Sequence, residues 1–130
     1  MADVVKTAQK NGVVDTRTAM YAMQNTGLVA GEDLQAAQAV RIGAAFKVYR
    51  ASNTAGSRFD GIAPKDTKAG QPITILGIGT RFHATEGDLD PTKHYYTSVT
   101  PGLFADAGTG EPVARAVSKH DLEVVRVGKV

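Results

Sequence analysis

The stretch ITILGIGTRF, residues 73–82, decides between two very different folds. A β-branched run that leads into Gly77-Ile78-Gly79 opens a dinucleotide-binding loop when a third glycine and a helix follow, because the N-terminus of that helix faces the phosphates. The residues that follow are Thr80-Arg81-Phe82, with no third glycine and no amphipathic helix pattern. Glycines within a strand otherwise mark bulges or tight bends. The stretch therefore predicts a β-strand that ends in a bend.

The rest of the chain is divided into similarly short segments. Fourteen glycines and five prolines interrupt the 130 residues, and the segments between them are rich in Val, Ile, Thr, Tyr and Phe. This pattern is typical of an all-β domain. We therefore expect a mainly β fold, a small β-barrel or β-sandwich with at most short helices. The predicted strands are residues 45–51, 59–64, 72–79, 94–99, 112–117 and 121–127.

Two segments depart from the β pattern. Residues 32–40, EDLQAAQAV, have an acidic start followed by alanines and glutamines, which predicts a short helix. Residues 16–25, TRTAMYAMQN, are compatible with one or two helical turns or with an extended arm. Met20 and Met23 can pack in either conformation, so the sequence leaves both open.

The two halves of the chain share a spacing of apolar residues. The first half contains Asp33-Leu34, Val40, Val48-Tyr49, Ile62-Ala63 and Ile73-x-Ile75, and the second contains Asp88-Leu89, Tyr95, Leu103-Phe104, Val113-Ala114 and Val124-x-Arg126. Because strands of any barrel carry β-branched residues at similar spacing, coincidence is the alternative to duplication. A duplication predicts two similar β modules that close on each other, since neither half buries its apolar face alone.

Composition excludes several classes of protein. Cysteine is absent, which removes disulfides, thiolate nucleophiles and cysteine-ligated zinc. The 15 basic and 13 acidic side chains leave a net charge of +2 and are scattered along the chain, which argues against nucleic-acid binding. No apolar run approaches the roughly 20 residues that cross a bilayer. We therefore expect no membrane association, and no N-terminal stretch has the pattern of an export signal.

The residues that could carry chemistry show no catalytic or metal-binding spacing. His83, His94 and His120 are not arranged as His-x-His or His-x-x-x-His, although a site assembled in space is an alternative. No Gly-x-Ser-x-Gly nucleophile elbow is present. The acidic loop of residues 86–90 lacks the alternating ligands of a calcium site. The sequence therefore predicts no catalytic residue, no cofactor and no metal.

The first 14 residues differ from the rest. They place isolated valines among lysines, glutamine and asparagine, which predicts an extended, exposed N-terminal arm over residues 1–14 and a single β-rich domain over residues 15–130. Pairs of valines are unfavourable in a solvated tail, and they favour the addition of a β-strand to a neighbouring protein. The predicted partner-binding residues are Val4, Val5, Val13 and Val14.

Several short glycine-based phrases occur in a fixed order along residues 26–127. They are Gly61-Ile62-Ala63, Gly70-Gln71-Pro72, Gly87-Asp88-Leu89, Tyr96 and the run Pro112-Val113-Ala114-Arg115-Ala116-Val117-Ser118. In this order they resemble the decoration, or cement, proteins of tailed-bacteriophage capsids, in the general plan of the lambda head decoration type. The chain departs from that plan at Asp90-Pro91-Thr92, where a glycine-containing turn is commoner.

The resemblance implies a β-barrel-like fold without enzymatic activity. It implies a virion protein, made in the host cytoplasm, that binds the outer surface of an icosahedral head at junctions of major capsid proteins and stabilises the mature shell. It also implies self-association as a homotrimer, with a dimer as the known variant. The alternatives are a small histidine- and metal-dependent enzyme that uses His83, His94 and His120, or a barrel that binds nucleic acid or glycan.

Overall fold

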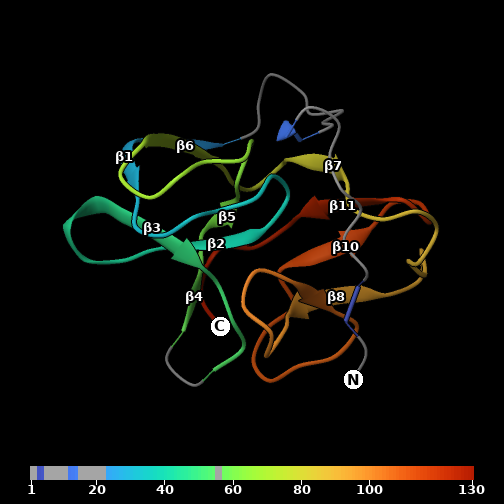
Figure 1. The fold of residues 1–130 in the computed structure, drawn as a ribbon. Coiled ribbons are helices and arrows are strands. Elements are labelled where there is room, and N and C mark those ends of the chain that lie inside the picture. The colour runs from blue at the N-terminus through green and yellow to red at the C-terminus, as the bar shows by residue number, and fades with distance from the viewer. Residues whose placement is uncertain (1–2, 5–11, 15–22, 55–56) are drawn as a thin grey trace.

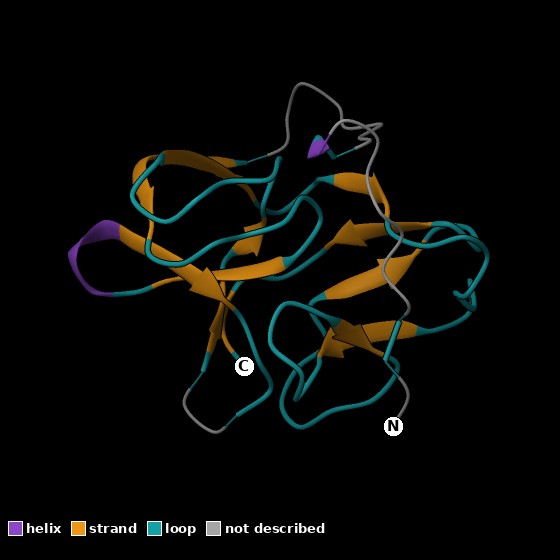
Figure 2. Ribbon diagram, in the orientation of Figure 1, coloured by secondary structure: helices purple, strands orange, loops and turns teal. Residues whose placement is uncertain are grey.

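The computed structural model describes residues 3–4, 12–14, 23–54 and 57–130, and within these ranges the chain is mainly β (Figures 1 and 2). A short 3-10 turn, η2, covers Ala44–Phe46. The strands are β1 Gln24–Ala30, β2 Ala39–Ile42, β3 Lys47–Arg50, β4 Arg58–Phe59, β5 Gly61–Ile62, β6 Pro72–Leu76, β7 Arg81–His83, β8 His94–Thr97, β9 Phe104–Ala105, β10 Ala114–Ala116, β11 Asp121–Val124 and β12 Gly128–Lys129. No helix in the described ranges is both long and apolar enough to span a bilayer.

The strands form a closed barrel and a separate five-stranded sheet, which lie side by side in Figure 1. The barrel has the order β1-β3-β2-β5-β6, and β1 closes it by pairing parallel to β3 and antiparallel to β6. The second sheet has the order β7-β11-β10-β8-β9. The short strands β4 and β12 pair with each other. The expected small β-barrel is confirmed.

The two sheets repeat one topology. Reading the barrel from β3 gives β3-β2-β5-β6-β1, and reading the second sheet from its far edge gives β9-β8-β10-β11-β7. Each of the five barrel strands therefore has a counterpart at the same place in the second sheet, and the counterparts follow the same order along the chain. This agreement supports two similar β modules, because chance apolar spacing would not also reproduce the strand order.

The sequence match between the modules is out of register at its end. Val40 pairs with Gly61, and Tyr95, which the spacing matches to Val40, pairs with Ala114. One residue further along, Ile62 pairs with Leu76 and Arg115 pairs with Glu123. The counterpart of Ile75 is thus Leu122, not Arg126 as the spacing predicted. Both side chains are fully buried, so the register follows the inward-facing positions of each strand.

The bend at the glycines is confirmed, and it joins the two modules. Strand β6 ends at Leu76, and a turn closes with a 3.2 Å hydrogen bond from the Thr80 N–H to the Gly77 carbonyl. Gly79 has φ of 93°, a conformation that glycine adopts without strain. Strand β7 then begins at Arg81 in the other sheet. The predicted strand 72–79 therefore stops three residues early, because the bend starts at the first glycine.

The predicted helix over residues 32–40 is wrong. Its backbone bonds to distant segments: the Leu34 N–H donates to the Thr67 carbonyl (2.8 Å), and the Ala37 N–H donates to the Ala63 carbonyl (2.9 Å). Ala37 has φ of 71°, outside the helical region. Apolar side chains are buried on more than one face of this segment, so tertiary burial overrides the helix propensity of its alanines.

Other predicted strands are present with shorter bounds. The strands predicted over 72–79, 94–99, 112–117 and 121–127 contain β6, β8, β10 and β11. The strand predicted over 45–51 begins only at Lys47, and the one predicted over 59–64 is divided at Asp60 between β4 and β5. Strand β1 begins at Gln24, so the described end of the ambiguous segment 16–25 is extended rather than helical.

Two buried clusters hold the modules together. The barrel interior is aliphatic and contains Leu28, Ala30, Leu34, Val40, Val48, Ala63, Ile73 and Ile75. A second cluster, here called the shared core, combines residues of both modules and includes Ala39, Phe59, Ile62, Phe82 and Phe104. Successive residues of β2 serve different clusters, because strand side chains alternate between faces. The barrel therefore buries side chains on its outside as well as its inside.

Candidate functional site

Two of the four valines predicted to bind a partner are buried in the chain's own shared core. Val4 is 5% exposed and its N–H donates to the Phe104 carbonyl (2.8 Å). Val14 is 8% exposed and its N–H donates to the Pro64 carbonyl (2.7 Å). The prediction of an exposed arm is wrong at these two positions, because each valine gains more from burial and a backbone hydrogen bond than from solvent.

The other two valines have different outcomes. Val13 is 54% exposed and forms an isolated antiparallel bridge with Lys65. Val5 lies outside the described residues. Partner binding by these valines stays a prediction, and of the three that are described only Val13 presents its side chain to solvent.

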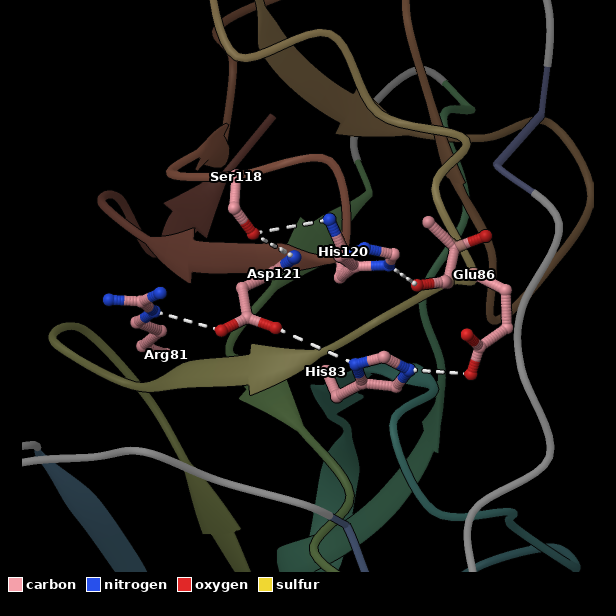
Figure 3. Close-up of polar contacts among 7 residues, drawn as sticks. Arg81, His83, Glu86, Ser118, His120 and Asp121 are labelled. Atoms are coloured by element: carbon pink, nitrogen blue, oxygen red, sulfur yellow. Dashed lines mark hydrogen bonds and ion pairs between the residues drawn. The ribbon is translucent and has the colours of Figure 1, made fainter.

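A polar cluster lies beside β7 and β11 (Figure 3). Asp121 is 3% exposed and accepts a 2.9 Å hydrogen bond from Arg81 Nε. Its Oδ1 lies 3.7 Å from His83 Nδ1, and His83 Nε2 lies 2.9 Å from Glu86 Oε1. The His120 ring stacks on the His83 ring with centroids 5.7 Å apart. Basic and acidic groups thus alternate along the wall of a pocket of about 350 Å³.

The local sequence explains how this cluster forms. Along β7, Arg81 and His83 point to the outer face while Phe82 is fully buried in the shared core. Asp121 is the register partner of His83 on β11. The turn before β11 is held by Ser118, whose Oγ accepts a hydrogen bond from the Asp121 N–H (3.1 Å). Sheet pairing therefore brings together groups that are far apart in the sequence.

The arrangement does not favour the three-histidine metal site. His94 lies on β8, which β10 and β11 separate from the strand that carries His83. In the described ranges no group of three or more histidine, aspartate or glutamate side chains is arranged to hold a metal ion. The ion pair between Arg81 and Asp121 instead ties β7 to β11.

Arginines line a second pocket, of about 490 Å³, at the barrel end near β3 and β4. Arg50 Nη2 lies 3.1 Å from Glu32 Oε1, and Arg58 Nη2 lies 2.8 Å from Asp60 Oδ1. The hydrogen bond and charge of Asp60 raise the pKa of Arg58 above its usual value. These two guanidinium groups already bind carboxylates, which neutralises much of their charge. The third arginine of the pocket, Arg41, has its guanidinium 4.9 Å from the centre of the Tyr49 ring.

The acidic loop of residues 86–90 leads into a closed turn that begins at Asp90. Asp90 Oδ1 accepts hydrogen bonds from the Thr92 N–H (2.9 Å) and the Thr92 hydroxyl (2.7 Å). These bonds lower the pKa of Asp90. The Lys93 N–H donates to the Asp90 carbonyl (3.0 Å), which completes the turn. The Asp90-Pro91-Thr92 departure from the decoration-protein plan is therefore accommodated by a side-chain-capped turn without glycine.

Sequence reasoning missed the exposed apolar side chains on loops and edges. Phe46 is 72% exposed at the tip of the β2–β3 hairpin. Val99 is 57% exposed after β8, and Met23 is 57% exposed just before β1. The sequence predicts a strand over residues 45–51, which includes Phe46. A residue in such a strand is not expected at the exposed tip of a turn. The preceding Gly43 was the available signal for a turn at this point in the chain.

Comparison with known proteins gives no family model that matches the chain and no matching curated protein. The resemblance to capsid decoration proteins therefore depends on the glycine-based phrases themselves.

Proposed function

We propose that this chain is a capsid decoration protein, which binds the outer surface of an icosahedral phage head at junctions of major capsid proteins and stabilises the mature shell. Its partners are the major capsid protein and further copies of itself, as a homotrimer or a dimer, and its location is the exterior of the virion. The observation that carries the proposal is the presence of exposed apolar side chains on the loops and edges of a tightly interlocked two-module β body.

The decoration-type phrases occupy structural positions in that body. Gly61-Ile62-Ala63 covers β5 and the residue after it, and Gly70-Gln71-Pro72 leads into β6. The Pro112–Ser118 run surrounds β10, the counterpart of β5 in the second module. The resemblance therefore follows the repeated framework rather than one isolated loop, which supports the proposal.

The modules are interlocked by backbone hydrogen bonds, which suits a rigid clamp. The Ala39 N–H donates to the Gly102 carbonyl (2.9 Å), and the Gly102 N–H donates to the Ala51 carbonyl (2.8 Å). A loop of the second module is thus inserted between β2 and the end of β3. A protein that braces a seam between larger subunits loses less entropy on binding when its own parts are fixed relative to one another.

A decoration protein stabilises a shell through mass action and avidity. Any protein that binds the assembled shell but not its dissociated subunits raises the stability of the shell. Many symmetry-related copies also compensate for modest affinity at each site. Such a function requires exposed contact side chains and a stable scaffold, and it requires no reactive group.

The proposal is tested by mixing the purified protein with mature shells of its phage that lack it. We expect saturable binding at a fixed stoichiometry and a rise in the temperature at which the shells break open. Mass measurement of intact particles should give a copy number close to that of the major capsid protein. Shells that neither bind the protein nor gain stability would contradict the proposal.

Two measurements on the same sample separate the alternatives. Elemental analysis that finds stoichiometric metal would favour the histidine-dependent enzyme. Salt-dependent retention on heparin or single-stranded DNA would favour a nucleic-acid-binding or glycan-binding barrel.

A further inference from the structure

The β2–β3 hairpin ends in a strained turn that presents an aromatic ring to solvent. The turn η2 is drawn in purple at the left of Figure 2, where it projects from the barrel away from the second sheet. Ala45 and Phe46 both have φ of 59°, a conformation that residues other than glycine rarely adopt. Phe46 is nevertheless 72% exposed, the largest exposed fraction among the large apolar side chains of the described residues.

A stacked support holds this turn in place. The Tyr49 ring packs against two glycines, and a Cβ built on Gly31 would lie 2.6 Å from that ring and one built on Gly43 2.8 Å from it. The Arg41 guanidinium lies 4.9 Å from the centre of the same ring. The Gly43 N–H also donates to the Lys47 carbonyl (2.7 Å), which closes the hairpin below the turn. The tip of the hairpin therefore projects from the barrel, and the contacts of Tyr49 and Gly43 hold it in place.

Folding alone does not account for Phe46. An exposed phenylalanine gains little from burial, and its left-handed backbone adds a cost that glycine would avoid. A strained residue at a surface is expected where binding compensates for it, and aromatic side chains are frequent anchors in protein interfaces. We propose that Phe46 is the anchor by which the β2–β3 hairpin docks into an apolar pocket of a protein partner. This assignment rests on the proposed function, in which that partner is the capsid surface.

Charge near the tip specifies the rim of the partner pocket. Lys47 follows Phe46 directly and is exposed, and Arg41 lies on the neighbouring strand. An exposed lysine beside an apolar anchor favours a pocket whose edge carries carboxylates, since like charges at such an edge would oppose docking. The partner surface is therefore an apolar pocket with an acidic rim.

The test compares the affinity of variants for shells that lack the decoration protein. Phe46→Ala removes the ring and keeps the backbone conformation, and we expect binding about tenfold weaker or more. Phe46→Gly removes both the ring and the strain, and we expect the same loss of affinity with a thermal unfolding midpoint at least as high as that of the wild type. Lys47→Glu should weaken binding at low salt, with the loss reduced at high salt.

One control isolates the anchor. Ala45→Gly relieves the strain at the neighbouring residue and keeps the Phe46 ring, so it should bind within about twofold of the wild type. Wild-type binding with an unaffected Phe46→Ala variant would overturn the anchor and leave the proposed function intact. Absence of wild-type binding would overturn both. A Lys47→Glu variant that binds as tightly as the wild type would overturn the acidic rim.

Discussion

The barrel of the first module and the open sheet of the second share one strand order but treat their sheet edges differently. In the barrel, β1 pairs parallel to β3 through Val29 with Lys47 and Ala30 with Val48, so that the sheet closes on itself. The counterparts of these strands, β7 and β9, stand at opposite ends of the second sheet. The barrel thus has no free strand edge, because its own strands pair all the way round. The second sheet has two edge strands, β7 and β9, which other parts of the protein must cover.

The two modules also bury different kinds of side chain. The barrel interior contains only aliphatic side chains, which fit the narrow space inside five strands. The open sheet packs aromatic rings in the shared core: Phe104 of β9 meets Phe59 of β4, the strand just before β5 of the barrel, edge-on with centroids 5.8 Å apart. The second module is therefore completed by packing on the first, and the two should unfold as one unit.

The barrel requires a glycine on β5, where the strand comes close to the end of β6. Gly61 has φ of 149°, and a Cβ on it would lie 2.2 Å from the Leu76 carbonyl oxygen. We expect Gly61→Ala to lower the free energy of unfolding by about 3 kcal/mol or more, because it combines a backbone clash with a disfavoured φ. Equilibrium denaturation followed by circular dichroism measures this change.

The matched control lies at the corresponding position of the second module. Tyr95 pairs with Ala114 as Val40 pairs with Gly61, and the methyl group of Ala114 is buried in the shared core. Ala114→Gly should cost only about 1 to 2 kcal/mol, from added backbone freedom and a lost buried methyl group. If the two variants lost the same free energy of unfolding, the special requirement for glycine at residue 61 would be contradicted.

Asn53 joins the modules through a fully satisfied side chain. Its Nδ2 donates to Thr97 Oγ1 (3.2 Å) and to the Thr109 carbonyl (3.1 Å), and its Oδ1 accepts from the Thr109 N–H (2.9 Å) and hydroxyl (2.8 Å). Asn53→Ala should lower the free energy of unfolding by about 2 kcal/mol, because it leaves these groups without their partner. Thermal unfolding of Ser52→Ala serves as the control and should stay within about 0.5 kcal/mol of the wild type, because Ser52 is only half-buried and its hydroxyl bonds to Thr54 in the same loop. A single transition that is unchanged in Asn53→Ala would argue that this contact does not link the modules.

The smallest expected effect concerns Asp33 in the β1–β2 loop. Its Oδ1 accepts a 2.9 Å hydrogen bond from the Ala69 N–H, and Lys68 Nζ lies 3.6 Å from Oδ2. The hydrogen bond first and the Lys68 charge second hold the pKa of Asp33 below its usual value of 3.8. The stabilisation is therefore fully present above pH 3.8 and is lost as the pH falls through the lowered pKa of the folded protein.

We accordingly expect Asp33→Asn to melt at a slightly lower temperature than the wild type at pH 7. The difference should shrink as the pH is lowered below 3.8. Lys68→Gln should reproduce part of it, since it removes the charge and keeps the backbone hydrogen bond. A difference in melting temperature that does not change with pH would contradict this account of Asp33.

Local pattern was sufficient for some parts of the fold and insufficient for others. The bend after Leu76 was predictable because two glycines interrupt a β-branched run, and strands such as β6 and β11 are rich in β-branched or aliphatic residues. Strand β7, with three residues, is too short to show a period and exists because β11 pairs with it. The helix expected over 32–40 failed because Leu34 and Ala37 bond to residues far along the chain.

The candidate sites likewise include features that the sequence predicts and features that it does not. The glycine-based phrases that support a decoration role could be read directly from the sequence. The burial of Val4 and Val14 could not, because it depends on which distant strands lie beside the N-terminal residues. Exposure of Phe46 depends on a left-handed turn that neither alanine nor phenylalanine signals by composition.

The sequence by itself determined that this protein is a β domain of short strands with a bend at Gly77 to Gly79, because strand propensity and glycine conformation are local properties. Only the tertiary structure decided which of two equivalent modules closes, which valines are buried and which aromatic ring faces solvent. Those outcomes depend on hydrogen bonds and packing between residues distant in the chain, whose pairing no local pattern specifies.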